Sequence, residues 1–135
     1  MAHEVMVVDD AVMMRTVLRT VVESTTQFHV VATAANGKEA LKQLEREPNL
    51  KVILVDLEMP EMDGFEFIRH AKLKTRAKII VVSSVAVIGS PQAVKARQLG
   101  ADAIVAKPSG AISLDFADKR GSELVRVMSA LVRPE

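Results

Sequence analysis

Five short apolar segments recur along the chain, and each is followed by residues with helical spacing. The segments are apolar throughout, without polar alternation, and they lie at residues 4–8, 28–34, 52–57, 78–83 and 103–106. Such strands are typical of a parallel sheet whose two faces are both covered by helices. The pattern therefore predicts an α/β fold, a three-layer sandwich with five strands and five helices.

The predicted helices follow from apolar residues spaced three or four positions apart. Ser90 and Pro91 fit the N-cap and first position of a helix over residues 91–99, and Gly100 fits its C-terminal left-handed position. Another helix ends before Pro48. The positions that predict the remaining helices are Val12, Val17, Leu18, Val21 and Val22; Ala40, Leu41 and Leu44; Phe65, Ile68 and Ala71; and Leu124, Val125, Met128, Leu131 and Val132.

Length and composition narrow the class of protein. The 135 residues fit a single domain, 1–135, and most of the seven Met are expected in its core. The net charge of +1, without Trp or Tyr, does not favour nucleic-acid binding by the chain itself. Cys is absent, and neither a signal peptide nor a long apolar segment is present, so we expect a cytoplasmic protein that does not bind membranes.

Polar residues end four of the five predicted strands. Right-handed crossovers bring the carboxyl ends of parallel strands to one edge, where ligands bind in folds of this type. Asp9, Asp10, Asp56, Ser83 and Lys107 are therefore candidates for one site. Taken alone, Asp56 could equally cap the turn that follows it, and only the five residues together predict a site.

Three carboxylates at one edge repel one another unless a cation is bound. Oxygen ligands suit Mg²⁺ better than zinc, and His3, His29 and His70 show no metal-ligand spacing. Lys107 and Ser83 could contact phosphate oxygens. The set predicts a phosphoryl-transfer site with a carboxylate nucleophile.

The chain resembles the response-regulator receiver family over almost its entire length. The matching residues are Val7-Val8-Asp9-Asp10, Asp56 with Met59-Pro60 and Met62-Asp63-Gly64, Ser83-Ser84, Gly100-Ala101 and Lys107-Pro108. The resemblance implies a flavodoxin-like fold with the strand order 2-1-3-4-5.

The resemblance also implies a role for each site residue. Asp56 would accept the phosphoryl group, and Asp10 and Asp9 would bind the metal together with Asp56 and the backbone carbonyl of Glu58. Ser83 would report phosphorylation, and Lys107 would contact the phosphoryl group. A cis peptide is implied between Lys107 and Pro108.

Within this family, Val82-Ser83-Ser84 and residues 107–115 are similar to the receiver part of the chemotaxis methylesterase. The sequence contains no Gly-x-Ser-x-Gly elbow, so we expect no methylesterase activity from it. The chain is then either a stand-alone regulator or an excised regulatory domain.

Two departures from the family pattern concern signal output. Ile104 stands where many receivers have an aromatic residue, so coupling through that position should be muted. Residues 85–88 are more apolar than usual, and they either fold onto the core or form a partner-binding patch. We expect the output surface at residues 84–90 and around Ile104.

The leading functional hypothesis is a switch of two-component signalling, related to chemotaxis, and not a turnover enzyme. A sensor histidine kinase would phosphorylate Asp56, and the change would alter binding to a downstream partner or fused effector domain. The alternative is a small Mg²⁺-dependent phosphatase with an aspartate nucleophile. Such enzymes need a second Asp two residues later, where this chain has Glu58. A flavin-binding module of the same topology is a third possibility, but this chain lacks a Ser/Thr/Gly-rich phosphate loop after the first strand and the aromatic residues that would enclose the flavin ring.

Overall fold

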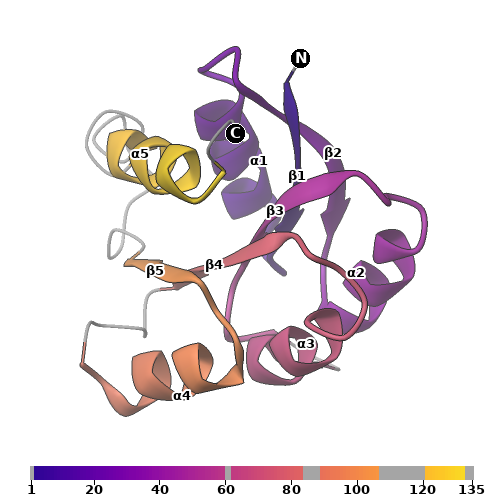
Figure 1. The fold of residues 1–135 in the computed structure, drawn as a ribbon, viewed down its shortest axis with the longest axis vertical. Coiled ribbons are helices and arrows are strands. Elements are labelled where there is room, and N and C mark those ends of the chain that lie inside the picture. Colours follow the sequence, from indigo (N-terminus) through magenta and orange to yellow (C-terminus); the bar gives the residue numbers. More distant parts are fainter. Residues whose placement is uncertain (1, 60–61, 84–88, 107–120, 133–135) are drawn as a thin grey trace.

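The fold was analysed in a computed structural model, which describes residues 2–59, 62–83, 89–106 and 121–132. Strands and helices alternate from the first element to the last (Figure 1). The strands are β1 His3–Val8, β2 Phe28–Ala34, β3 Leu50–Val55, β4 Lys78–Ser83 and β5 Ala103–Ala106. The helices are α1 Val12–Val22, α2 Gly37–Leu44, α3 Gly64–Ala71, α4 Pro91–Leu99 and α5 Gly121–Leu131.

The five strands form one parallel sheet in the order β2-β1-β3-β4-β5, which confirms the expected topology. All strands point the same way, so their carboxyl ends share one edge. The order reverses at β1, and β1 and β3 lie side by side at the centre of the sheet. Ligands of such sheets bind beside this reversal, so the candidate site is expected there.

Helices cover both faces of the sheet, as the continuous apolar strands predict. Successive residues of each strand face opposite layers: Ile53 packs with α2, α3 and α4, and its neighbour Leu54 packs with α1 and α5. Both side chains are fully buried. Figure 1 shows α1 and α5 on one side of the sheet and α2, α3 and α4 on the other.

The observed bounds agree closely with the predicted ones, except at β3. We expected this strand at residues 52–57, but it spans Leu50–Val55. Leu57 is buried although it lies beyond the strand, in the loop that packs back onto the core. Burial, not strand structure, accounts for the apolar residue at this position. Asp56 is consequently the first residue after the strand.

One predicted helix face was partly wrong, and another was incomplete. On α1, Val12 is exposed and Met14 is buried in its place. On α3, Phe67 is the fully buried aromatic residue, while Phe65 is only partly buried. Val12 lies at the first position of its helix, where the chain has not yet turned toward the sheet. Most of the described Met residues are in the core, as expected: Met6, Met14, Met59 and Met128 are buried.

The predicted ends of α4 are confirmed. The Ser90 side chain accepts a hydrogen bond from the backbone N–H of Ala93, and Pro91 is the first helical residue. Gly100 ends the helix with φ of 122°, a conformation that favours glycine. Among the described residues, no helix is long and apolar enough to cross a membrane.

Candidate functional site

The register of the central strands brings two of the predicted carboxylates together. Val8 of β1 is paired with Val55 of β3, so Asp9 and Asp56 leave the sheet side by side. Both remain tied to it by their backbones. The N–H of Asp9 donates to the carbonyl of Ala34 at 3.0 Å, and the N–H of Asp56 donates to the carbonyl of Val8 at 3.0 Å. Rigid strands therefore fix the positions of both side chains.

Asp10 completes a cluster of three carboxylates at this edge. One carboxylate oxygen from each of Asp9, Asp10 and Asp56 lies within 4.8 Å of the others. Asp9 is 1% exposed and Asp56 is 6% exposed, whereas Asp10 faces solvent. Two side chains of the cluster are therefore buried, and the third, Asp10, is exposed to solvent.

The loops around the cluster orient its carboxylates. Oδ1 of Asp9 accepts a hydrogen bond from the N–H of Ala11 at 2.9 Å, and Oδ1 of Asp56 accepts a longer one, 3.4 Å, from the N–H of Glu58. Nη1 of Arg15 donates to the backbone carbonyl of Asp9 at 2.7 Å. Arg15 was not among the predicted site residues. Its signal is a basic residue one turn into the helix that follows the aspartate pair.

The cluster fits a hard divalent cation. Its donors are all carboxylate oxygens from three residues, close enough together to share one ion, and a cation would offset their mutual repulsion. Mg²⁺ typically keeps several water ligands and binds only one or two carboxylates directly. Because Asp10 is exposed to solvent, water can reach this side of the cluster. The chemistry of the donor set therefore matches the predicted metal.

The loop between β3 and α3 is held against the cluster by backbone contacts that require a glycine. Gly64 donates its N–H to the carbonyl of Leu57 at 2.9 Å. A Cβ on Gly64 would lie 2.6 Å from Cα of Leu57 and even closer to the carbonyl oxygen of Asp56. The side chain of the preceding residue, Asp63, caps α3 by accepting a hydrogen bond from the N–H of Glu66. The tight contact between Gly64 and the backbone of Asp56 was not predicted.

The remaining predicted site residues lie on the neighbouring strands. Ser83 is the last residue of β4, is fully buried, and pairs with Ala106 at the end of β5. Lys107 directly follows Ala106 in the sequence but lies outside the described residues, as do Pro108 and residues 84–88. The expected cis peptide and most of the expected output surface are therefore not described. Glu58 is exposed in the loop after Asp56.

Comparison with known proteins identifies the family. The model of the response regulator receiver domain matches residues 5–115, which include strands β2 to β5, most of β1 and the carboxylate cluster. A protein-glutamate methylesterase/protein-glutamine glutaminase of Halalkalibacterium halodurans is 41% identical over 128 residues, 94% of this chain. Those residues are 36% of the relative, so the chain spans about a third of the length of the curated relatives it matches.

Two solved structures resemble the chain over nearly its full length. A chain in the complex of the CheA3 P1 domain with CheY6 from R. sphaeroides is 56% identical, with a TM-score of 0.79; the match covers 96% of this chain and 95% of that one. The response regulator domain of Thermotoga maritima CheB is 32% identical, with a TM-score of 0.89; the match covers 99% and 100% of the two chains. Both neighbours are chemotaxis proteins.

Proposed function

Because the chain belongs to the response regulator receiver family, we propose that it is a phosphorylation-dependent signalling module whose phosphoacceptor is Asp56. The observation that supports this proposal best is the cluster of Asp9, Asp10 and Asp56 at the carboxyl edge of the sheet. Asp56 lies where β3 ends, and the backbone of Gly64 packs against it. A nucleophile fixed in this way loses little entropy on reaching the transition state.

The proposed step is transfer of a phosphoryl group from a phosphohistidine. A carboxylate oxygen of Asp56 forms the new bond to phosphorus, and the bond from phosphorus to the imidazole nitrogen breaks. The nitrogen keeps the electron pair, and Asp56 becomes an acyl phosphate. The kinase supplies the phosphohistidine, so the receiver itself needs only to hold its nucleophile and offset negative charge.

Asp9, Asp10, Asp56 and the backbone carbonyl of Glu58 are the proposed ligands of Mg²⁺. When bound, this ion would neutralise the charge that develops on the phosphoryl oxygens. Ser83 and Lys107 are proposed to contact the phosphoryl group, as a hydroxyl donor and as a point charge. Ser83 is buried at the end of β4, so any movement of its hydroxyl would be transmitted to the segment that follows.

The donor and the output are proposed from the relatives. One solved neighbour contains a CheA3 P1 domain together with CheY6, which supports a sensor histidine kinase of chemotaxis as the donor. Two forms of output are proposed. In one, a stand-alone cytoplasmic regulator acts on a separate protein. In the other, which the methylesterase relatives support, the receiver controls a fused effector domain. In either case the receiver is the switch and performs no turnover of its own.

Mass spectrometry after incubation with acetyl phosphate and Mg²⁺ tests the proposed phosphoacceptor. The wild-type protein should gain a single phosphoryl group, and Asp56→Asn should gain none, because an amide is not a nucleophile of comparable strength. Borohydride trapping then locates the modified residue. Label on Asp9 or Asp10 in the wild type would contradict the assignment.

Asp63→Asn is the matched control, because it removes the same charge from the adjacent loop. Asn is as good an N-cap as Asp, so α3 should remain intact. This variant should take up phosphate like the wild type. If Asp63→Asn and Asp56→Asn lost uptake equally, loop charge and not the nucleophile would explain the loss.

A further inference from the structure

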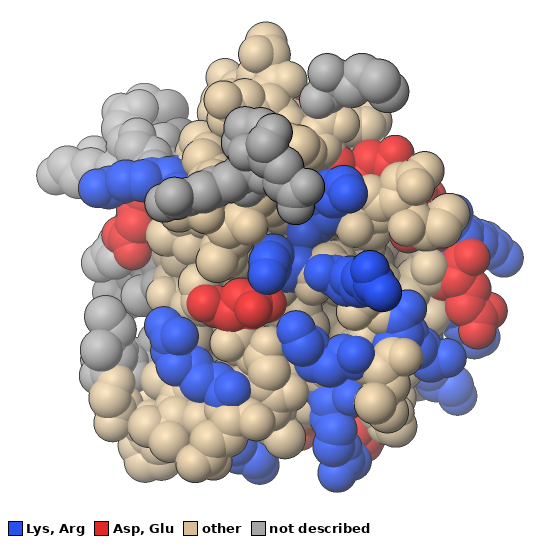
Figure 2. All heavy atoms as spheres, in the orientation of Figure 1, with Lys and Arg blue, Asp and Glu red and all other residues tan. Residues whose placement is uncertain are grey.

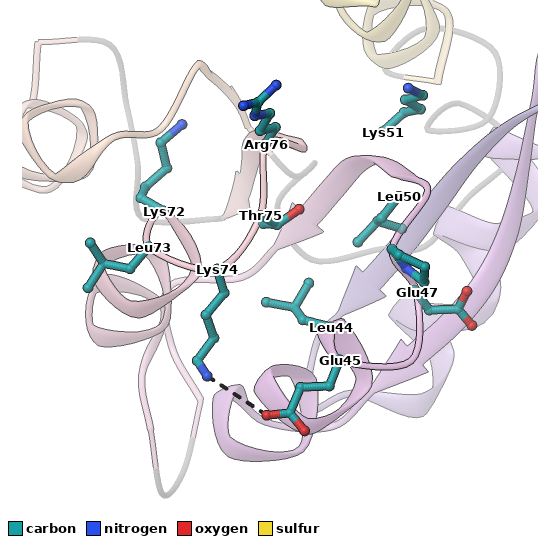
Figure 3. A pocket seen from close by; sticks show the side chains of 11 residues that line it. Leu44, Glu45, Glu47, Leu50, Lys51, Lys72, Leu73, Lys74, Thr75 and Arg76 are labelled. Carbon is teal, nitrogen blue, oxygen red and sulfur yellow. Dashed lines mark ion pairs between the residues drawn. The ribbon is translucent and has the colours of Figure 1, made fainter.

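A cleft of about 730 Å³ lies at the opposite edge of the sheet from the carboxylate cluster. It is formed where β3 and β4 begin, between the segment after α2 and the segment after α3 (Figure 3). Strands β3 and β4 are parallel, so their amino ends are separated from Asp56 and Ser83 by the length of the sheet. The proposed phosphorylation chemistry therefore does not use this cleft.

The charged residues that line the cleft are mostly basic. Lys51, Lys72, Lys74 and Arg76 contribute to it, against the carboxylates of Glu45 and Glu47. Figure 2 shows Lys and Arg side chains gathered over the middle and lower right of this side of the molecule. The chain as a whole has a net charge of only +1, so the positive charge here is a local feature.

Two of these cations are already paired and two are not. Lys74 lies 3.9 Å from Glu45, and Lys72 lies 3.7 Å from Asp102. Lys51 and Arg76 are exposed and form no ion pair with any carboxylate in the described part of the chain. Figure 3 shows Lys51, Lys72 and Arg76 along one rim and the Lys74–Glu45 pair at the opposite end.

Apolar side chains lie between the charged groups. Leu44 and Leu50 are buried in the wall of the cleft, and Leu73 stands at its rim with 85% of its surface exposed. Leu73 is the most exposed of the large hydrophobic residues in the described ranges. A ligand that covered it would remove apolar surface from water, worth roughly 25 cal/mol for each Å².

We propose that this cleft binds an acidic segment of a partner protein, in which carboxylates flank an apolar side chain. The carboxylates would meet Lys51 and Arg76 on the rim, and the apolar side chain would cover Leu73. Arg76 offers the planar fork that binds a carboxylate through two hydrogen bonds. The site lies away from the carboxylate cluster, so it would bind its partner whether or not Asp56 is phosphorylated.

The composition of the cleft favours a protein segment over a nucleic acid. Glu45 and Glu47 interrupt the cations and would repel a continuous phosphate backbone. None of the described residues that line the cleft is aromatic, so these residues offer bases no platform on which to stack. The exposed Leu73 instead matches an apolar side chain of a peptide.

Fluorescence anisotropy with the intact chain tests the proposal. The probe is a fluorescein-labelled peptide in which Glu and Leu alternate, and the comparison ligands are the matching Lys-Leu peptide and oligo(dT). We expect binding of the Glu-Leu peptide only. The double variant Lys51→Glu/Arg76→Glu should weaken it by about fivefold or more, because two attractive rim charges become repulsive.

Arg19→Glu/Lys38→Glu is the matched control, because it makes the same charge change at exposed positions of α1 and α2, outside the cleft. This control should bind the peptide within about twofold of the wild type, since distant surface charges are screened. Leu73→Ser should also weaken binding, because it removes the apolar contact without changing the charge. Charge attraction alone would leave the affinity of this variant unchanged. Equal losses in the two charge-reversal variants, or oligo(dT) binding as tight as the peptide, would overturn the proposal.

Discussion

At the scale of single residues, Asp10 differs from its two neighbours because it faces solvent while Asp9 and Asp56 are buried. The variant Asp10→Asn keeps the size of the side chain but removes about one unit of charge from the proposed metal site. Folding should survive, and Mg²⁺ affinity measured by calorimetric titration should fall by at least about tenfold.

Glu58→Gln provides the control for this prediction. It removes one charge from an exposed side chain in the adjacent loop, and its proposed contribution to the metal is a backbone carbonyl that the substitution keeps. Its Mg²⁺ affinity should stay close to that of the wild type. The proposed ligand set would be wrong if Asp10→Asn bound Mg²⁺ within about twofold of wild type.

Gly64 gives a second prediction at this scale, because its missing side chain makes room for the backbone of Asp56 and Leu57. Gly64→Ala should destabilise the protein by about 1–3 kcal/mol, as overpacking does, and should slow phosphate uptake by displacing Asp56. Urea unfolding and the rate of uptake from acetyl phosphate measure the two effects.

Gly89→Ala is the control that separates the effect of backbone strain on stability from the effect of displacing Asp56. Gly89 has φ of 83°, so alanine would be strained there by about 1–2 kcal/mol, but an added Cβ would meet no atom within 4 Å among the described residues beyond its chain neighbours. Stability should fall in this variant without a change in the uptake rate. Unchanged uptake in Gly64→Ala would show that the glycine does not position Asp56.

The sequence predicts which residue types gather at the site but not how their backbones are held. Asp9, Asp10 and Asp56 were placed at one edge because strand ends are visible in the apolar pattern. The support from Arg15 and Gly64 was not predicted, because both act on backbone atoms and such contacts depend on the path of a loop. The exposure of Val12 was also not predicted. Periodicity predicts which face of a helix is apolar, but not at which residue that face begins to contact the core.

At the scale of elements, two hydrogen bonds join the chain near the starts of β4 and β5, and the apolar pattern does not predict them. The N–H of Ile79 donates to Oδ2 of Asp102 at 2.8 Å, and the N–H of Asp102 donates to the carbonyl of Ile79 at 2.8 Å. Lys72 adds an ion pair to the same carboxylate. Asp102 therefore joins the starts of the two strands.

Asp102→Ala should destabilise the protein by about 1–3 kcal/mol, because the N–H of Ile79, a buried residue, loses its partner. Asp63→Ala, which removes the N-cap of α3, provides a comparison with an expected loss of about 1 kcal/mol. Urea unfolding measures both. Hydrogen exchange at Ile79 should accelerate only in Asp102→Ala, and an unchanged rate there would contradict the assigned role.

Element bounds were predictable where the sequence contains an explicit stop signal. Ser90-Pro91 and Gly100 mark both ends of α4, and the bounds of β2, β4 and β5 were also predicted correctly. The bounds of β3 were shifted because Leu57 is buried without belonging to the strand. An apolar pattern predicts burial. A buried loop residue next to a strand extends the pattern just as another strand residue would, so the pattern alone cannot place the end of the strand.

At the scale of the whole molecule, the sheet has two chemically different edges. The carboxyl edge gathers the three carboxylates, and the amino edge contains the basic cleft beside Lys51 and Arg76. The parallel arrangement of the strands produces this separation, because every crossover returns the chain to the same starting edge. A partner bound in the cleft would leave Asp56 open to a kinase.

The same sheet links two cores that lie on its opposite faces. Ile53 belongs to the core under α2, α3 and α4, and Leu54 belongs to the core under α1 and α5. Both lie in β3 at the centre of the sheet, so neither core can lose its strand without the other. We therefore predict that each of Ile53→Ala and Leu54→Ala destabilises both layers together.

The expected loss for each variant is about 2–5 kcal/mol, the usual effect of truncating a buried aliphatic side chain. Urea unfolding followed through separate amide signals on α1 and α3 measures the two layers independently, and their midpoints should coincide in both variants. Leu73→Ala is the control, because its exposed side chain should change stability by no more than about 0.5 kcal/mol. If Ile53→Ala lowered the midpoint for α3 and left that for α1 unchanged, the sheet would not couple the two cores.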